Sequence, residues 1–154
     1  MNNTEYIHDI VCQVLVQEKS SDLIYAVLNE FIPDYTPLNL GYAGKPDDLS
    51  FVFSSEEEMI LYYAETPNVE QTFYWNKRKD NPHKIMVGAN ITNDNQIVFS
   101  LTLNGTHSTE AQYYIRLKRF LKSNIGVISY VDPVYYLNGE DFKKRYGNVV
   151  YEFE

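Results

Sequence analysis

Three adjacent carboxylates, Glu56, Glu57 and Glu58, are the residues whose types most suggest acid–base chemistry. Helix geometry argues against it, because neighbouring residues point about 100° apart and adjacent carboxylates do not converge on one substrate atom. Ser54 with Glu57, and Ser55 with Glu58, have the spacing of a capping box, and acids in a first turn complement the helix dipole. The segment therefore predicts a helix start rather than a catalytic site.

Histidine and cysteine side chains are the next candidates for chemistry. His8 and Cys12 stand four residues apart, a spacing that on a helix would let a histidine activate a thiol. Cys12 lies in an apolar stretch that we assign to a core-facing helix, where free cysteine usually packs as a small hydrophobic residue. His83 and His107 have no helical partner and no spacing typical of zinc ligands. We therefore expect no catalytic residue, no metal site and no cofactor.

The acidic residues are concentrated in the first half of the chain. Residues 1–76 hold thirteen acidic and two basic residues, whereas residues 77–154 hold eight acidic and eleven basic ones, giving a net charge of −8. Such a surface repels nucleic acid and attracts a basic partner. Acidity also keeps a protein soluble, so the charge alone does not identify a partner.

Hydrophobic periodicity predicts an α+β fold, and 154 residues suffice for one domain, residues 1–154, but not for two comfortable ones. The fold should contain an antiparallel sheet of four to five strands, packed against N-terminal helices and a long helix that follows the central hairpin. Residues 33–48, with three prolines, should form a long surface loop. The expected helices cover residues 4–15, 20–31, 54–65, 111–123 with Thr109 as cap, and 138–147; the expected strands cover 49–53, 69–78, 85–91, 97–103 and 124–133.

The expected location is the cytoplasm. The N-terminal stretch has no basic region followed by an apolar run, and no apolar run in the chain has the length of a membrane span. The single cysteine, Cys12, suits a reducing compartment. We expect no membrane partner.

A resemblance to known proteins covers roughly residues 84–147. The stretch "VGANITNDNQIVFSLTLNG", followed by "YYIRLKRFLKSNIGVISYVDPVYYLNGEDF", resembles small bacterial α+β immunity proteins of polymorphic-toxin and contact-dependent competition systems. The resemblance implies a non-catalytic protein that binds a cognate toxin stoichiometrically in the cytoplasm and needs no cofactor. It carries over no individual binding residue.

The partner face predicted from charge and aromatic content lies in the long loop and the helix after it. Tyrosines, of which the chain has fourteen, give large contact area at interfaces, although they also suit half-buried margins. A basic toxin would meet the acids. The predicted partner-binding residues are Asp47, Asp48, Glu56, Glu57, Glu58, Tyr62 and Tyr63. A rival face is the polar side of the sheet, with Tyr74, Asn76, Asn90 and Thr102.

Two other classes of function stay open. A small enzyme would need convergent titratable groups in a pocket, with His8, Cys12 or the glutamates lining it. A small-molecule-binding module would instead need a sizeable apolar cavity, for example between the first two helices and the sheet.

Overall fold

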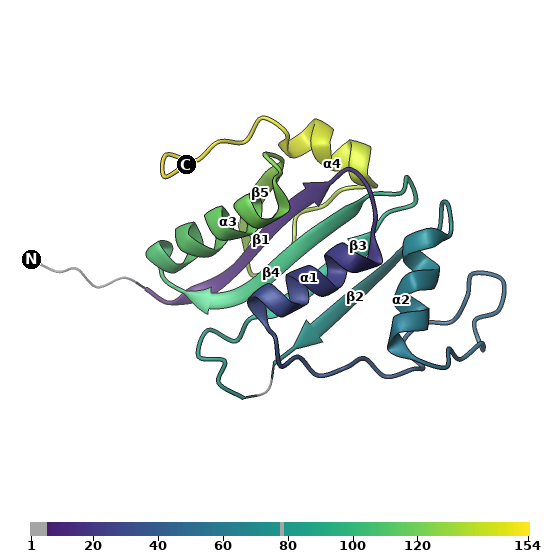
Figure 1. Cartoon of the computed structure of the whole chain (residues 1–154). Coiled ribbons are helices and arrows are strands. Elements are labelled where there is room, and N and C mark those ends of the chain that lie inside the picture. Colours follow the sequence, from purple (N-terminus) through teal and green to yellow (C-terminus); the bar gives the residue numbers. More distant parts are fainter. Residues whose placement is uncertain (1–5, 78) are drawn as a thin grey trace, which may run out of the picture.

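The structure is a computed structural model that describes residues 6–77 and 79–154. Within those residues an antiparallel five-stranded sheet of order β2-β3-β4-β1-β5 is combined with four helices, which confirms the α+β class (Figure 1). The elements in chain order are β1 His8–Val16, α1 Ser21–Phe31, α2 Glu56–Glu65, β2 Gln71–Asn76, β3 Met86–Ile91, β4 Ile97–Gly105, α3 His107–Leu121, β5 Gly126–Tyr130 and α4 Gly139–Tyr146.

The helix predicted over residues 4–15 is wrong: from His8 onward the segment is strand β1, and residues 4 and 5 lie outside the described residues. β1 pairs with both β4 and β5 near the centre of the sheet. Ile10, Cys12 and Val14 are buried on one face, and Val11 and Leu15 on the other. Because both faces are covered, the polar-apolar alternation that marks a half-buried strand is absent.

Helices α1, α2 and α3 cover one face of the sheet and enclose the main core (Figure 1). Ser20 caps α1 by accepting a hydrogen bond from the Leu23 amide at 3.3 Å, so this helix is confirmed. No helix in the described part of the chain is both long and apolar enough to cross a membrane. The helices contribute to the main core Ile24, Val27, Leu28 and Phe31 from α1, Met59, Ile60 and Tyr63 from α2, and Tyr114, Leu117 and Leu121 from α3.

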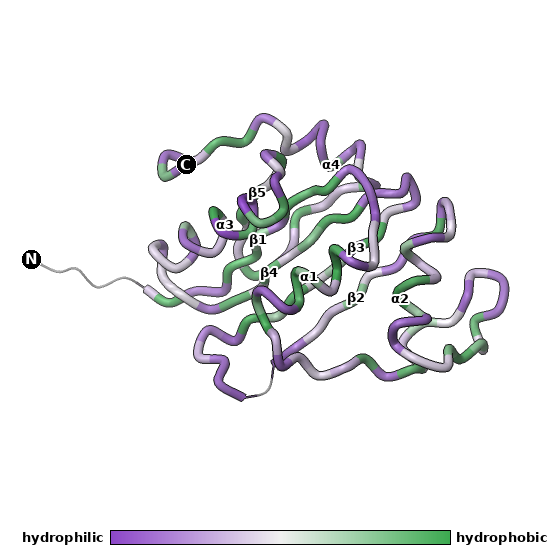
Figure 2. The backbone as a smooth tube through the Cα atoms, viewed as in Figure 1, coloured by the Kyte–Doolittle hydropathy of each residue, from purple (hydrophilic) through white to green (hydrophobic). Residues whose placement is uncertain are grey.

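The opposite face of the sheet is covered only in part. Helix α4 places Phe142 on a small second core made by Leu15, Val98 and Val127. The turn between β3 and β4 fixes this helix, because the Asp94 carboxylate accepts hydrogen bonds from the backbone amides at the start of α4. Figure 2 shows the interior strand β1 as mostly hydrophobic, whereas the edge strand β2 is mostly polar or intermediate.

The strand predicted over residues 49–53 does not form. The long loop instead makes a tight turn in which the backbones of Lys45 and Asp48 exchange hydrogen bonds of 3.0 Å. Phe53 is buried in the main core, and the Lys45 ammonium lies 4.0 Å from the centre of the Phe51 ring. The apolar residues of this segment therefore serve to anchor a loop, not to pair with a strand.

Helix α3 begins earlier than predicted. Thr106, not Thr109, is its N-cap, and the Thr106 hydroxyl accepts a hydrogen bond from the Thr109 amide. The earlier start brings His107 and Glu110 into the first turn of the helix.

Candidate functional site

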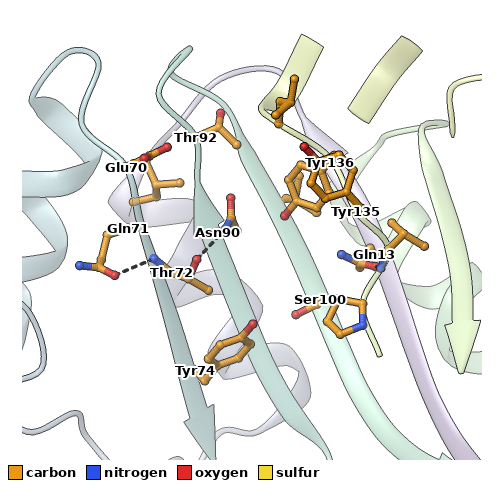
Figure 3. A pocket seen from close by; sticks show the side chains of 15 residues that line it. Gln13, Glu70, Gln71, Thr72, Tyr74, Asn90, Thr92, Ser100, Tyr135 and Tyr136 are labelled. Carbon is orange, nitrogen blue, oxygen red and sulfur yellow. Dashed lines mark hydrogen bonds between the residues drawn. The ribbon is translucent and has the colours of Figure 1, made fainter. Parts of the chain in front are cut away.

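A groove of about 530 Å³ lies on the uncovered part of the second sheet face (Figure 3). Its floor comes from β2, β3, β4 and β1, and its wall is the segment between β5 and α4, residues 133–137, which we call the groove wall. Because strand side chains alternate between faces, the residues on the floor have the opposite parity to those of the main core. The polar side chains that line it from the strands include Thr72, Tyr74, Asn90, Ser100 and Gln13.

Hydrogen bonds fix part of this floor and leave part available. The Asn90 side-chain amide donates to the Thr72 hydroxyl at 2.6 Å, an interaction between neighbouring strands (Figure 3). Gln13 is buried, and its side-chain carbonyl accepts from the Val134 amide at 2.9 Å, which ties the groove wall to the floor. The Ser100 hydroxyl makes no hydrogen bond to the described part of the chain, so it is available to a ligand.

A glycine in β3 shapes the floor. A Cβ at Gly88 would lie 2.2 Å from the Ser100 hydroxyl oxygen and 2.9 Å from the Tyr74 ring, closer than real atoms approach. The missing side chain therefore lets the Tyr74 ring lie over the backbone of β3. A side chain at position 88 would therefore displace Tyr74 and Ser100, two residues that line the groove.

The groove wall is held in place by α4. The Tyr136 ring packs edge-on against Phe142 at 5.1 Å, and burial raises the pKa of the Tyr136 hydroxyl, which stays protonated. The Tyr146 hydroxyl donates to the Tyr135 carbonyl at 2.7 Å. Tyr135 itself is largely exposed, so an aromatic side chain stands at the rim on a fixed backbone.

The chemistry of the lining is that of uncharged hydrogen bonding. Among the described residues that line the groove, Glu70 alone has a formal charge, and the others are amides, hydroxyls, tyrosines and aliphatic residues. Binding a phosphate group would call for Lys or Arg, and acid–base catalysis calls for paired titratable groups. The arrangement suits a ligand rich in amide and hydroxyl groups, such as a segment of another protein.

Two residues of the predicted acidic face are internal. Glu56 is buried, and its carboxylate accepts hydrogen bonds from the Leu38 amide at 2.6 Å and from Tyr25 and Trp75, each at 3.2 Å. Tyr63 is also buried, and its hydroxyl donates to a carbonyl in the long loop. Neither side chain is available to a partner, because both hold the loop and α2 against the sheet.

The other residues of that face are at the surface, several with local structural roles. The Glu58 amide donates to the hydroxyl of the N-cap residue Ser55 at 3.1 Å, and the Glu58 carboxylate accepts hydrogen bonds from the amide and hydroxyl of Ser54. Asp48 accepts hydrogen bonds from Ser50 in the turn of the long loop. Asp47 and Glu57 are exposed, and Tyr62 is half-buried against Phe53. The acidic face is therefore reduced to a few solvent-facing charges.

The rival face contributes two of its four predicted residues to the groove. Tyr74 and Asn90 line it, whereas Asn76 and Thr102 have the same strand parity but lie outside it. The face predicted from the sequence does not include Ser100, Gln13 or the groove wall. The alternation in β4, with Val98, Ser100 and Thr102 on one side, was the signal that could have identified the floor.

The predicted helical pairing of His8 with Cys12 is absent because both lie on β1. Four residues along a strand span about 13 Å, too far for a histidine to take a thiol proton. Burial, with a smaller effect from Glu110, raises the pKa of Cys12, so the thiol stays protonated. His83 contacts the Asn104 carbonyl at 3.2 Å, and His107 lies in the first turn of α3.

No protein-family model, curated protein or solved structure matches the chain. The site is therefore interpreted from its geometry.

Proposed function

We propose that this protein is a non-catalytic binding protein that recognises a segment of another protein in the groove. The observation that carries the proposal is a groove of about 530 Å³ whose lining is almost wholly uncharged and hydrogen-bonding. A peptide segment presents amide donors and acceptors along its length, and the Ser100 hydroxyl can bind them. Such recognition needs neither a cofactor nor a reactive side chain.

The edges of the sheet favour binding to its face. At the β5 edge the Ile128 amide donates to the Tyr151 hydroxyl at 2.8 Å, and at the β2 edge the Asn76 carbonyl accepts from the Thr36 amide at 2.9 Å. Both edges are thus partly closed to strand addition, the usual mode of peptide binding at a sheet edge.

The surroundings of the groove have the anatomy of a protein interface. Exposed Tyr135 and Leu137 line the groove beside its polar floor. Interface cores are enriched in aromatic and apolar side chains, next to polar groups that set orientation. The volume also falls in the range of small-molecule sites, roughly 300–1,000 Å³, but such sites are mostly apolar.

The biological role that we propose is neutralisation of a toxin, as an immunity protein. The supporting resemblance covers residues 84–147, which include β3, β4 and the whole groove wall. The net charge of −8 and the single acidic side chain at the groove would favour encounter with a basic toxin. We propose that one chain binds one toxin molecule in this groove.

Photo-crosslinking tests which face binds. A photoreactive phenylalanine analogue replaces Tyr74 in the groove or Glu57 on the acidic surface, and the full chain is expressed in the source organism. We expect a single crosslinked protein from position 74 and none from position 57. A specific product from position 57 alone would move the site to the acidic surface.

A matched pair of substitutions then tests the role. Ser100→Lys puts a charged chain into the groove, whereas Thr102→Lys makes the same change two residues along the strand, outside the groove. The crosslinked partner should arrest growth when expressed alone, and both the wild-type chain and Thr102→Lys should restore growth. The proposal fails if Ser100→Lys protects equally well, or if the partner is harmless.

A further inference from the structure

Two histidines and a glutamate meet at the end of the sheet where β1 begins and α3 starts. His8 is paired with Gly105, the last residue of β4, and α3 begins two residues later, which brings its first turn to His8. The Glu110 carboxylate oxygen Oε1 lies 3.1 Å from His8 Nε2 and 2.6 Å from His107 Nδ1. The predicted absence of a metal site rested on linear spacing, which did not show this group.

In its neutral form, His8 presents the lone pair of Nε2 to Glu110. His8 Nδ1 lies 3.0 Å from the Tyr6 carbonyl, which can only accept, so Nδ1 carries the hydrogen. In a neutral imidazole Nε2 then has no hydrogen, and its lone pair faces the Glu110 carboxylate. Two acceptors at 3.1 Å repel each other, so this contact requires a positive charge between or beside them, which either a proton or a metal ion can supply. A backbone carbonyl that fixes the other ring nitrogen is the usual support of a metal-binding histidine.

The Glu110 carboxylate is also oriented by a hydrogen bond, and it also requires a neighbouring positive charge. Glu110 is only 5% exposed, and among the described residues it has no Lys or Arg partner. A buried carboxylate without a cation is costly. The Tyr130 hydroxyl lies 2.7 Å from Glu110 Oε2 and 3.0 Å from Oε1, which orients the carboxylate, and Oε1 also faces the two imidazoles.

We propose that His8, His107 and Glu110 bind a divalent transition-metal ion, with Zn²⁺ as the ion to test. Two imidazole nitrogens and one carboxylate oxygen are a common donor set for this class of ion. The candidate donor atoms lie within 4.8 Å of one another, so small side-chain rotations bring them around one ion. The His107 side chain is 72% exposed, which leaves a fourth position open to water or to an external ligand.

The test measures Zn²⁺ affinity of the full chain by competition with a chromophoric chelator, without a polyhistidine tag that would bind zinc itself. We expect one equivalent to bind, and Co²⁺ to give the visible absorption of a tetrahedral site. Glu110→Gln and His107→Ala should each weaken binding at least tenfold. Tyr130→Phe, which removes only the supporting hydroxyl, should weaken it by about 10- to 100-fold.

His83→Ala is the matched control, because it removes a histidine whose ring contacts Asn104 and Tyr113 and is not one of the three donors. Its affinity should equal that of the wild type. Equal affinities of the wild type and His107→Ala would overturn the proposal and leave a protonated histidine–carboxylate cluster. Full binding by Glu110→Gln, with a native circular dichroism spectrum, would also overturn it. The proposal is independent of the function proposed for the groove.

Discussion

Removing the Glu56 carboxylate should destabilise the fold far more than removing its neighbour Glu57. Glu56 is buried and accepts hydrogen bonds from the Leu38 amide, the Tyr25 hydroxyl and the Trp75 indole. Each buried donor left without an acceptor costs about 1–3 kcal/mol, and water entry recovers part of this, so Glu56→Ala should cost about 3–5 kcal/mol. Glu57 is exposed, and Glu57→Ala should cost under about 0.5–1 kcal/mol, mostly from the helix dipole.

Urea unfolding followed by tryptophan fluorescence measures this difference, because Trp75 is the single tryptophan, is buried, and contacts Glu56. With an m-value of about 2 kcal/mol per molar urea, the midpoint of Glu56→Ala should fall by about 1.5–2.5 M. The urea midpoint of Glu56→Gln, which keeps one oxygen acceptor, should lie between those of the wild type and Glu56→Ala. Equal midpoints for Glu56→Ala and Glu57→Ala would show that the carboxylate does not hold the loop, and would return Glu56 to the acidic surface.

Two further predictions concern α4. Phe142→Ala should cost about 3 kcal/mol, because the ring is fully buried, and should also loosen the groove wall; urea unfolding and crosslinking from position 74 measure the two effects. Burial alone would raise the pKa of Asp94, but hydrogen bonds from Thr92 and from the Glu140 and Gly139 amides outweigh it and lower the pKa. The contribution of Asp94 to folding stability is therefore complete at a pH above the ordinary Asp pKa of about 4. It is lost as the pH falls through the lower pKa that Asp94 has in the folded protein. Asp94→Asn should be about 1–2 kcal/mol less stable than the wild type at pH 7, and this difference should shrink as the pH is lowered below about 4; a difference that stays constant over that range would contradict the assignment.

Elements with local sequence patterns could be predicted, whereas the central strand could not. Helix α1, the N-terminus of α2 and the β3–β4 hairpin each depend on residues close together in the chain, so periodicity and capping identify them. β1 has no such local pattern because helices of the main core cover one of its faces and α4 packs on the other. Its apolar residues then follow no period of two, and Val11, Val14 and Leu15 also fit the spacing of a helix.

The functional candidates could be predicted only in part because they are assembled from distant segments. Tyr74 and Asn90 were found through strand alternation, but Gln13 lies 61 residues before Tyr74 and was assigned to a helix. The same misassigned strand hid the three-residue cluster, since His8 meets Glu110 only through the pairing of β1 with β4. Gln13 and the three-residue cluster therefore both escape prediction from sequence because their positions depend on one long-range strand pairing.

The acidic surface and the groove are alternatives rather than parts of one interface. Helix α2 packs its buried residues on the face of the sheet that carries Phe73, whereas the groove lies on the face that carries Thr72 and Tyr74. A partner segment held in the groove therefore does not touch Glu57. Charges at that distance act through the long-range field, which changes association rates and their salt dependence more than affinity. The hydrogen-bonding floor and its aromatic rim must then supply the specificity, which is why we place recognition in the groove.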